Sequence, residues 1–296
     1  MIGFIGVGAM GGPMARRLLA AGLSVCAFDT DAERLAACAE SGVQLASDAA
    51  EVVARGEIVL LSLPSSEVFV RVAEQTLLPN ARPGQIFVDC GTTTPTETRR
   101  LAQRLAERDA FLVDAPVSGG ANGAERGVLR TFVGGDPEAV ARVRPILETI
   151  GGAEGLTACG PSGAGQIVKG VNQLAMGLGA AAYLEAVAFG VRAGVDPAII
   201  DQAVGGDGEH WRAIVRQTAQ AVADGRGARI GVKFRELPYY LHAARELGFD
   251  LPLTDALYAF CDRGERVVTD DNRPAPSFWH ELCAQTNQDK SDDNDH

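Results

Sequence analysis

The sequence lacks the features that mark several large classes of protein. Its six cysteines form no CxxC pair and no Cys/His cluster, so neither a disulfide framework nor a zinc site is predicted. Lysine and arginine number 27 against 38 acidic residues, and the formal net charge of −11 argues against nucleic acid or an anionic membrane as the main partner. We therefore expect reduced cysteines, no bound metal and no nucleic-acid or membrane partner.

No targeting or membrane-spanning segment is predicted either. The N-terminal residues MIGFIGVGAM have neither the basic start nor the long apolar run of a signal peptide. The most apolar later segment, 174–184, is short and rich in glycine and alanine, which argues against a bilayer span. The expected location is the cytoplasm.

Strand and helix patterns alternate over the first half of the chain. Short apolar runs that end at glycine or turn residues are separated by amphipathic stretches, a pattern typical of a mostly parallel sheet with helices on both faces. The predicted strands are 2–6, 23–29, 57–64, 84–90, 111–118 and 129–135, and the predicted helices are 13–21, 32–41, 95–109 and 137–151.

The pattern changes after about residue 160. A single long helix is predicted over 166–194, and helical patterns without a convincing strand follow it. A chain of 296 residues suits two domains. We predict an α/β domain over 1–160, an all-helical domain over 161–284 joined to it by the long helix, and a disordered acidic tail over 285–296.

A glycine-rich turn after the first predicted strand indicates a dinucleotide site. Gly6, Gly8 and Gly11 form GxGxxG at the start of a helix, where backbone can approach a pyrophosphate and the helix N-terminus supplies N–H groups. Asp29 ends the second predicted strand, where its carboxylate would bind the ribose hydroxyls of NAD and repel the 2′-phosphate of NADP. No arginine occurs at 29–33. The prediction is a doubly wound Rossmann domain that binds NAD; the alternatives are a plain tight turn with a surface aspartate, or FAD.

A polar patch is predicted on the long apolar helix. Within GAGQIVKGVNQ (163–173), Asn172 and Gln173 stand three and four positions after Lys169, so a helix places the three on one face. Hydride transfer to a carbonyl needs a proton donor at the oxygen, and a lysine whose pKa is lowered by partial burial can serve. The alternative is a lysine that extends its charged end to solvent from a mostly buried helix.

Two loops after predicted strands supply further candidates. Ser118 offers a hydroxyl, and Gly119 and Gly120 offer N–H groups, a combination suited to a carboxylate; a simple serine–glycine turn is the alternative. Thr92 lies where a cofactor could be contacted, with a helix-capping role as the alternative.

Four motifs in order along the chain carry a resemblance to a known family. They are GFIGVGAMGGPMARRLLAAG (3–22), DAPVSGG with GAERGVL (114–120 and 123–129), GAGQIVKGVNQ (163–173) and RELPYYLHAARELGFDLPLT (235–254). Over roughly residues 1–283 the chain resembles the β-hydroxyacid dehydrogenases, which include 3-hydroxyisobutyrate dehydrogenase and tartronate semialdehyde (2-hydroxy-3-oxopropionate) reductase. The resemblance implies a Rossmann domain followed by an all-α domain, and a homodimer or homotetramer formed through the latter.

The resemblance also implies a role for individual residues. Lys169 would be the catalytic acid/base, with Asn172 and Gln173 beside the substrate and Ser118, Gly119 and Gly120 on its carboxylate. The cofactor would be held by Gly6, Gly8, Ala9, Met10, Gly11, Asp29, Leu63, Pro64, Thr92 and Arg235. Two positions depart from the family: Gly91-Thr92 replaces Ser-Thr, and Arg235-Glu236 replaces Lys-Asp, although Lys233 could supply the amine instead.

The leading hypothesis is an NAD-dependent oxidoreductase that interconverts a small β-hydroxy acid, similar to 3-hydroxyisobutyrate or glycerate, and its semialdehyde. One alternative is an imine reductase of the same fold, which Lys169 argues against because those enzymes usually lack this lysine. A second is an NAD(P)-binding protein without turnover. The sequence leaves the identity of the hydroxy acid and the direction of the reaction open.

Overall fold

The computed structural model describes residues 1–224 and 236–260. Arg235, Lys233 and the tail predicted at 285–296 lie outside the described residues. The chain divides into two compact units, Met1–Gly170 and Val171–His296. The division falls inside one long helix, α9 (Ala164–Arg192), whereas the sequence placed a boundary between 160 and 161, before that helix begins.

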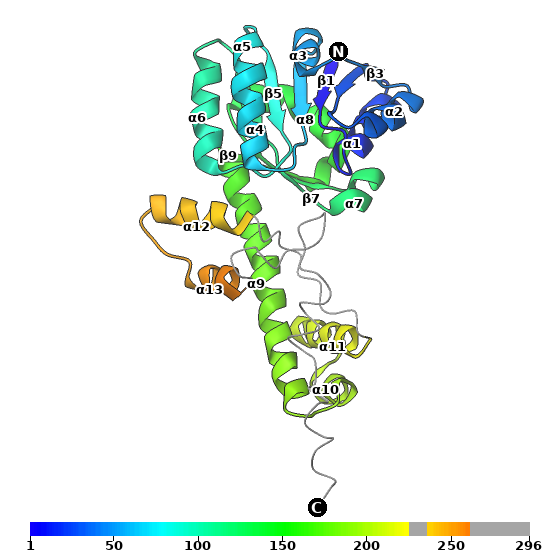
Figure 1. Cartoon of the computed structure of the whole chain (residues 1–296), viewed down its shortest axis with the longest axis vertical. Helices are drawn as coiled ribbons and strands as arrows, with labels where there is room; N and C mark the ends of the chain where they lie inside the picture. Colours follow the sequence, from blue (N-terminus) through cyan, green and yellow to red (C-terminus); the bar gives the residue numbers. More distant parts are fainter. Residues whose placement is uncertain (225–235, 261–296) are drawn as a thin grey trace, which may run out of the picture. The chain divides into compact units, whose positions relative to one another are not determined.

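A single twisted sheet forms the centre of the first unit (Figure 1). Its strands run in the order β3-β2-β1-β4-β5-β6-β8-β7, and β9 pairs with β8. The first six are parallel, β8 is antiparallel to β6 and β7, and β9 is parallel to β8. The strands are β1 (Ile2–Ile5), β2 (Val25–Phe28), β3 (Gln44–Leu45), β4 (Ile58–Leu61), β5 (Ile86–Asp89), β6 (Phe111–Asp114), β7 (Val117–Ser118), β8 (Arg130–Gly134) and β9 (Leu156–Gly160). This order, which reverses direction at β1, confirms the predicted doubly wound Rossmann domain.

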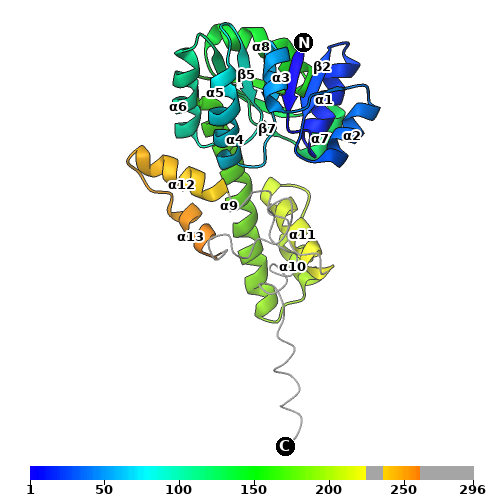
Figure 2. The same cartoon turned by 45° about the horizontal axis from the view of Figure 1, so that its top comes forward.

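Helices cover both faces of this sheet (Figure 2). Phe4 and Leu60 point into a core shared with α1, α2 and α8, whereas Ile5 and Leu61 point into a second core shared with α3, α4 and α6. Each such buried side chain contributes about 1.5–3 kcal/mol to stability. The helices are α1 (Gly11–Ala20), α2 (Ala32–Glu40), α3 (Ala49–Arg55), α4 (Ser66–Val72), α5 (Leu78–Asn80), α6 (Pro95–Ala106), α7 (Gly120–Arg126) and α8 (Pro137–Gly151), with a π turn at Ala73–Leu77 and a 3-10 turn at Ala153–Gly155.

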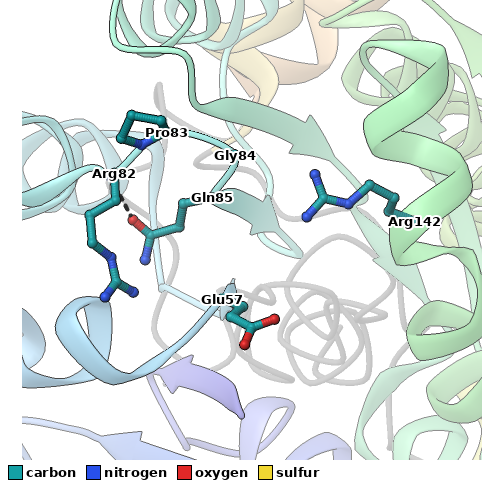
Figure 3. A pocket seen from close by; sticks show the side chains of 6 residues that line it. All are labelled: Glu57, Arg82, Pro83, Gly84, Gln85 and Arg142. Atoms are coloured by element: carbon teal, nitrogen blue, oxygen red, sulfur yellow. Dashed lines mark hydrogen bonds between the residues drawn. The ribbon is translucent and has the colours of Figure 1, made fainter.

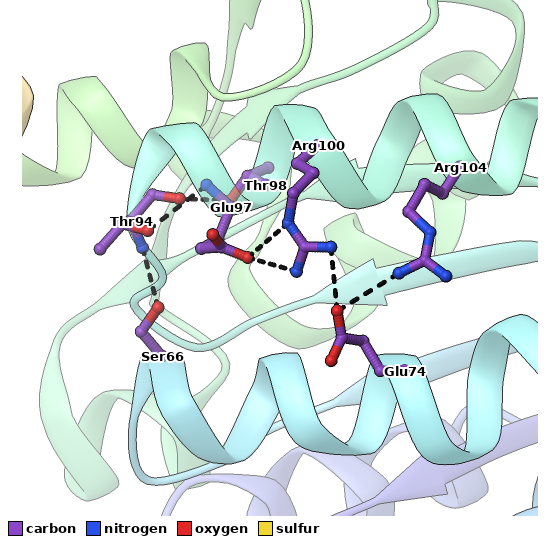
Figure 4. Close-up of polar contacts among 7 residues, drawn as sticks. All are labelled: Ser66, Glu74, Thr94, Glu97, Thr98, Arg100 and Arg104. Carbon is purple, nitrogen blue, oxygen red and sulfur yellow. Dashed lines mark hydrogen bonds and ion pairs between the residues drawn. The ribbon is translucent and has the colours of Figure 1, made fainter. Parts of the chain in front are cut away.

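Most helices of this unit begin at a side chain that accepts a first-turn N–H group. In α6, Thr94 Oγ1 accepts the Glu97 N–H at 3.4 Å, while the Thr94 N–H donates to Ser66 Oγ at 3.2 Å (Figure 4). Glu97 also pairs with Arg100 in the same helix. Asp31, Asp48, Ser65 and Asp136 cap α2, α3, α4 and α8 in the same way. By contrast, α1 and α7 have no side-chain cap.

The second unit is helical in the part that the structure describes. It contains the rest of α9 with α10 (Pro197–Val204), α11 (His210–Ala223), α12 (Leu237–Glu246) and α13 (Pro252–Phe260). Leu184 and Ala188 of α9 pack with Leu237 and Tyr240 of α12 in one small core. The helical character predicted for this region is confirmed for the described residues.

The length of α9 corrects one expectation. The segment Ala164–Val191 is long and apolar enough to cross a membrane, with a mean hydropathy of 1.6 and 28% of its most apolar window buried. The apolar core helix of a water-soluble protein passes the same test, so this is weak evidence for a membrane span. The prediction of no sufficiently long segment was wrong, because the helical pattern continues on both sides of 174–184.

Candidate functional site

The glycine-rich turn joins β1 to α1 at the carboxyl edge of the sheet. A side chain at Gly11 would collide with the carbonyl oxygen of Gly6, so the turn closes only without one. Met10 stands at the N-cap of α1 and offers no side-chain cap. The uncapped helix start can therefore direct its N–H groups and the positive end of its dipole at a pyrophosphate. Gly8 and Ala9 belong to the same turn, and these residues fit an NAD phosphate group.

Asp29 is fixed in place at the end of β2. Its Oδ2 accepts the Val7 N–H at 2.7 Å and its Oδ1 accepts the Asp31 N–H at 2.9 Å. Each carboxylate oxygen keeps a further lone pair that can accept a ribose hydroxyl. The carboxylate thus lies beside the glycine-rich turn, as a ribose contact requires.

A pocket of about 240 Å³ adjoins this turn, between α1 and α2. Arg34 lines it, forms an ion pair with Asp31 at 3.0 Å, and would lie 3.0 Å from a side-chain carbon placed on Gly8. No arginine occurs at 29–33, but Arg34, which was not predicted as a site residue, lies one position beyond that range. Arg34 stands in the first turn of α2, three residues after the N-cap Asp31, and this position could have identified it as a neighbour of the glycine-rich turn.

Leu63, Pro64 and Thr92 follow β4 and β5 at the same edge of the sheet. Leu63 and Thr92 are half-buried and Pro64 is exposed. Thr92 is not a helix cap, because Thr94 caps α6. That finding removes the alternative given for Thr92 and leaves the cofactor contact as a prediction.

Ser118 ends β7, and the next two residues open α7. Gly119 has a φ of 137°, which an ordinary side chain rarely permits, and it holds the N-cap position with no side-chain cap. Ser118 is half-buried, while Gly119 and Gly120 are exposed. Ser118, Gly119 and Gly120 are thus consecutive at the turn between β7 and α7, as the carboxylate hypothesis needs.

Lys169 is buried at the start of α9. Its side chain is 6% exposed, and its Nζ donates to the carbonyl oxygen of Val117 at 2.8 Å. The alternative of a lysine extending to solvent was wrong, because the ammonium group is tied to the residue that precedes Ser118.

Asn172 and Gln173 follow Lys169 along α9 but belong to the second unit. Asn172 Nδ2 lies 3.5 Å from Met176 Sδ, and Gln173 Nε2 donates to Glu236 Oε2 at 3.0 Å. Gln173 and Glu236 are both buried. The Gln173 amide thus already bonds to the Glu236 carboxylate. Arg235, which precedes Glu236 in the sequence, lies outside the described residues.

A buried polar cluster that was not predicted from the sequence lies beneath the start of α9. Asp89 and Asp114 end the adjacent strands β5 and β6, face one another in register, and are both 0% exposed. Asp89 accepts the Thr93 hydroxyl at 2.6 Å and the Gly91 N–H at 2.9 Å. Asp114 accepts the N–H groups of Gly163 at 2.8 Å and Gln166 at 3.1 Å.

Burial changes the acidity of both carboxyls. Burial, with a smaller contribution from the neighbouring Asp114 charge, raises the pKa of Asp89 to about 7, although the hydrogen bonds from Thr93 and Gly91 lower it. Burial also raises the pKa of Asp114, although the backbone N–H groups of Gly163 and Gln166 oppose the rise. Asp89 therefore changes protonation near neutral pH.

A second pocket, of about 400 Å³, lies at the opposite edge of the sheet, where β4 and β5 begin (Figure 3). Gln85 lines it together with Arg82, and both donate to the carbonyl oxygens of Val53 and Gly56 at the end of α3. These hydrogen bonds satisfy main-chain carbonyl oxygens at the C-terminal end of α3. In the described residues, no group of His, Cys, Asp and Glu could hold a metal ion, and Cys26, Cys38, Cys90 and Cys159 are free.

Comparison with known proteins assigns the family. Residues 1–160 match a family model described as the NAD binding domain of 6-phosphogluconate dehydrogenase, and residues 163–273 match one described as NAD-binding of NADP-dependent 3-hydroxyisobutyrate dehydrogenase. The chain belongs to the β-hydroxyacid dehydrogenase family. This β-hydroxyacid dehydrogenase therefore carries an NAD-binding domain, as predicted, and NADP is not excluded by the match.

Individual relatives of this β-hydroxyacid dehydrogenase agree in length and fold. The 2-(hydroxymethyl)glutarate dehydrogenase of Eubacterium barkeri is 33% identical over 86% of this chain and 85% of its own. The 3-hydroxyisobutyrate dehydrogenase of Pseudomonas aeruginosa is 37% identical over 68% of this chain and 67% of its own. A solved Mycobacterium tuberculosis 3-hydroxyisobutyrate dehydrogenase with L-serine has a TM-score of 0.80 at 28% identity, covering 96% of this chain and 99% of that one.

Proposed function

We propose that this β-hydroxyacid dehydrogenase interconverts a small 3-hydroxy acid and its semialdehyde with NAD, and that Lys169 is its general acid/base. The observation that carries the proposal is the burial of Lys169, with its Nζ 2.8 Å from the Val117 carbonyl, next to Ser118. A buried amine bonded to the residue that precedes Ser118, Gly119 and Gly120 suits a substrate that has a carboxylate at one end and a reacting hydroxyl nearby.

In the proposed reaction, Lys169 transfers the proton and the residues 118–120 bind the substrate. When bound, NAD supplies the acceptor for the hydride that leaves the hydroxyl-bearing carbon. Lys169, as a neutral amine, takes the hydroxyl proton while the C=O bond forms, and as an ammonium group it returns a proton to the oxygen in the reverse direction. The Ser118 hydroxyl and the N–H groups of Gly119 and Gly120 hold the substrate carboxylate and so orient the carbon that reacts.

We infer the substrate class from what the relatives' names share. Among them are dehydrogenases of 2-(hydroxymethyl)glutarate, 3-hydroxyisobutyrate and L-serine. Each of these compounds carries a hydroxymethyl group on the carbon next to a carboxylate, and they differ in the third substituent. We propose an acid of this form for the present enzyme; glycerate fits the same description, and 4-hydroxybutyrate does not.

The assay that tests the proposal follows NAD reduction with this panel of acids, in wild type and in Lys169→Ala. We expect turnover of one acid, and a loss of about 10²–10⁴-fold in kcat in the variant, because the proton transfer loses its base. NADH binding, measured by fluorescence, should be unchanged in Lys169→Ala, which serves as the control for folding. Full turnover in Lys169→Ala would refute the role of the lysine.

The same assay distinguishes the alternatives. Reduction of imines without turnover of any acid would favour an imine reductase, whose solved Pseudomonas example is 21% identical with a TM-score of 0.58 and shows only the shared fold. NADH binding without turnover of either class would indicate a binding protein. We propose a preference for NAD over NADP because Asp29 is fixed beside the turn, and because Arg34 is paired with Asp31.

We propose further that the enzyme is a homodimer or homotetramer. Support comes from apolar side chains of α9 that are exposed in the single chain: Val171 at 63%, Met176 at 47% and Phe189 at 79%. Light scattering of the purified protein measures the mass. A particle of 31.0 kDa, the mass of one chain, would refute the proposal.

A further inference from the structure

Gln166 has an unusual set of partners for a residue in the first turn of a helix. Its side chain is 1% exposed, and none of its side-chain bonds is to α9 itself. Oε1 accepts the Thr93 N–H at 3.1 Å, while Nε2 donates to the Gly91 carbonyl at 3.0 Å and to Asp89 Oδ2 at 3.3 Å. The amide thus connects α9 to the loop after β5, which contains Thr92.

The main chain of the same residue is bound as well. The Gln166 N–H donates to Asp114 Oδ2 at 3.1 Å, and the neighbouring Gly163 N–H donates to Asp114 Oδ1 at 2.8 Å. Asp114 ends β6, directly beside Asp89. Gln166 therefore attaches the first turn of α9 to the ends of two adjacent strands, β5 and β6, and Gly163 adds a second bond to β6.

Lys169 lies three positions further along this helix, on the same face. Its Nζ bonds to the Val117 carbonyl, so its position depends on where α9 starts relative to β7. We propose that Gln166 is a positioning residue of the reaction, which holds Lys169 in register with the Gly91–Thr93 loop. This inference rests on the proposed function, since it assigns Gln166 a role through Lys169.

Gln85 provides a matched control. It is also buried, at 3% exposed, and its Nε2 also donates to main-chain carbonyls, those of Val53 and Gly56, both at 2.7 Å. It precedes β5, whereas Gln166 contacts the loop that follows β5. A purely structural glutamine and a positioning glutamine can therefore be compared in one protein.

The experiment uses the full chain labelled with 13C at lysine Cε, because the sequence contains only three lysines, Lys169, Lys233 and Lys290. The signal that is lost in Lys169→Arg belongs to Lys169. Its chemical shift and titration are then recorded in wild type, Gln166→Met and Gln85→Met, and kcat and KM are measured with the acid that wild type turns over. Gln166→Asn, whose amide is one methylene too short for these contacts, replaces Gln166→Met if that variant does not fold.

We expect both variants to lose stability, and Gln166→Met alone to move the Lys169 signal and its titration midpoint. We also expect kcat to fall about 10–100-fold in Gln166→Met, with KM for NAD within about twofold, because a small displacement of the base is costly. An unmoved Lys169 signal and an unchanged kcat in both glutamine variants would overturn the inference. Full activity in Lys169→Ala would instead refute the proposed function, and the lysine signal would still decide whether Gln166 positions Lys169.

Discussion

The buried carboxyl of Asp89 makes stability depend on pH in a way that can be measured. Its pKa is about 7 in the folded protein, against 3.8 for the free group. Between these values the folded chain holds a proton that the unfolded chain has lost, so stability falls as the pH rises. At about 1.4 kcal/mol per unit, a shift of about three units costs about 4 kcal/mol by pH 8.

Asp89→Asn removes the ionisation and keeps most of the hydrogen bonds. The asparagine oxygen can accept the Gly91 N–H, and its amide can donate to the Thr93 hydroxyl, which rotates. We expect the variant to lie within about 1 kcal/mol of wild type at pH 4, and to gain about 4 kcal/mol relative to wild type by pH 8.

The assay is urea unfolding of both chains at each pH from 4 to 8, followed by circular dichroism. The quantity compared is the difference in unfolding free energy between the two chains, because titrating groups that do not interact with Asp89 contribute equally to both. The adjacent Asp114 is the exception, since its carboxyl interacts with that of Asp89. A difference that stays constant across this range would refute the pKa assigned to Asp89. A difference that grows as the pH falls would refute the sign of the argument.

Two further predictions concern helix starts. Gly11→Ala should abolish NADH binding, measured by fluorescence titration, because the added carbon collides with the Gly6 carbonyl. Gly208→Ala, whose side chain would meet no atom within 4 Å and whose φ is not positive, is the control for alanine in itself, and NADH binding by Gly11→Ala would contradict the account. Thr94→Ala should lower the unfolding free energy by about 1 kcal/mol, because α6 loses its N-cap. Thr92→Ala is the control and should leave the unfolding free energy unchanged. Equal losses for the two variants in urea unfolding would show that the cap is misassigned.

Much of the fold could be predicted because the central strands are buried on both faces. Strands such as 57–64 and 84–90 therefore appear in the sequence as continuous apolar runs. The prediction missed β3 and β9, whose exposed or half-buried residues give no such run, and it missed α3, α7, α13 and the stretch from α4 to α5. The predicted strand 111–118 is two strands, because Ala115 and Pro116 turn the chain between β6 and β7.

The candidate site was predictable only where spacing along one element decides it. The spacing on one helix made Lys169 a candidate, the resemblance to the family implied its catalytic role, and the glycine-rich turn was predicted from its order after β1. The contacts of Gln166 depend on which strands are neighbours and on the register of Asp89 with Asp114, which no local pattern contains. Likewise, three successive threonines precede Pro95, and the sequence does not reveal that Thr94 is the cap.

The attachment of α9 to β5 and β6 limits how this protein can be divided into fragments. A fragment that stops at residue 160, where the Rossmann pattern ends in the sequence, would remove the N–H groups of Gly163 and Gln166 from Asp114 and the Gln166 amide from Asp89. Asp114 would then lose the two N–H groups that bind its carboxyl, while Asp89 would lose one donor and keep those of Gly91 and Thr93, at a cost of about 1–3 kcal/mol for each donor lost. Domain exchange between relatives should therefore join the chains after Gly170, so that the first turns of the helix remain with the nucleotide-binding half.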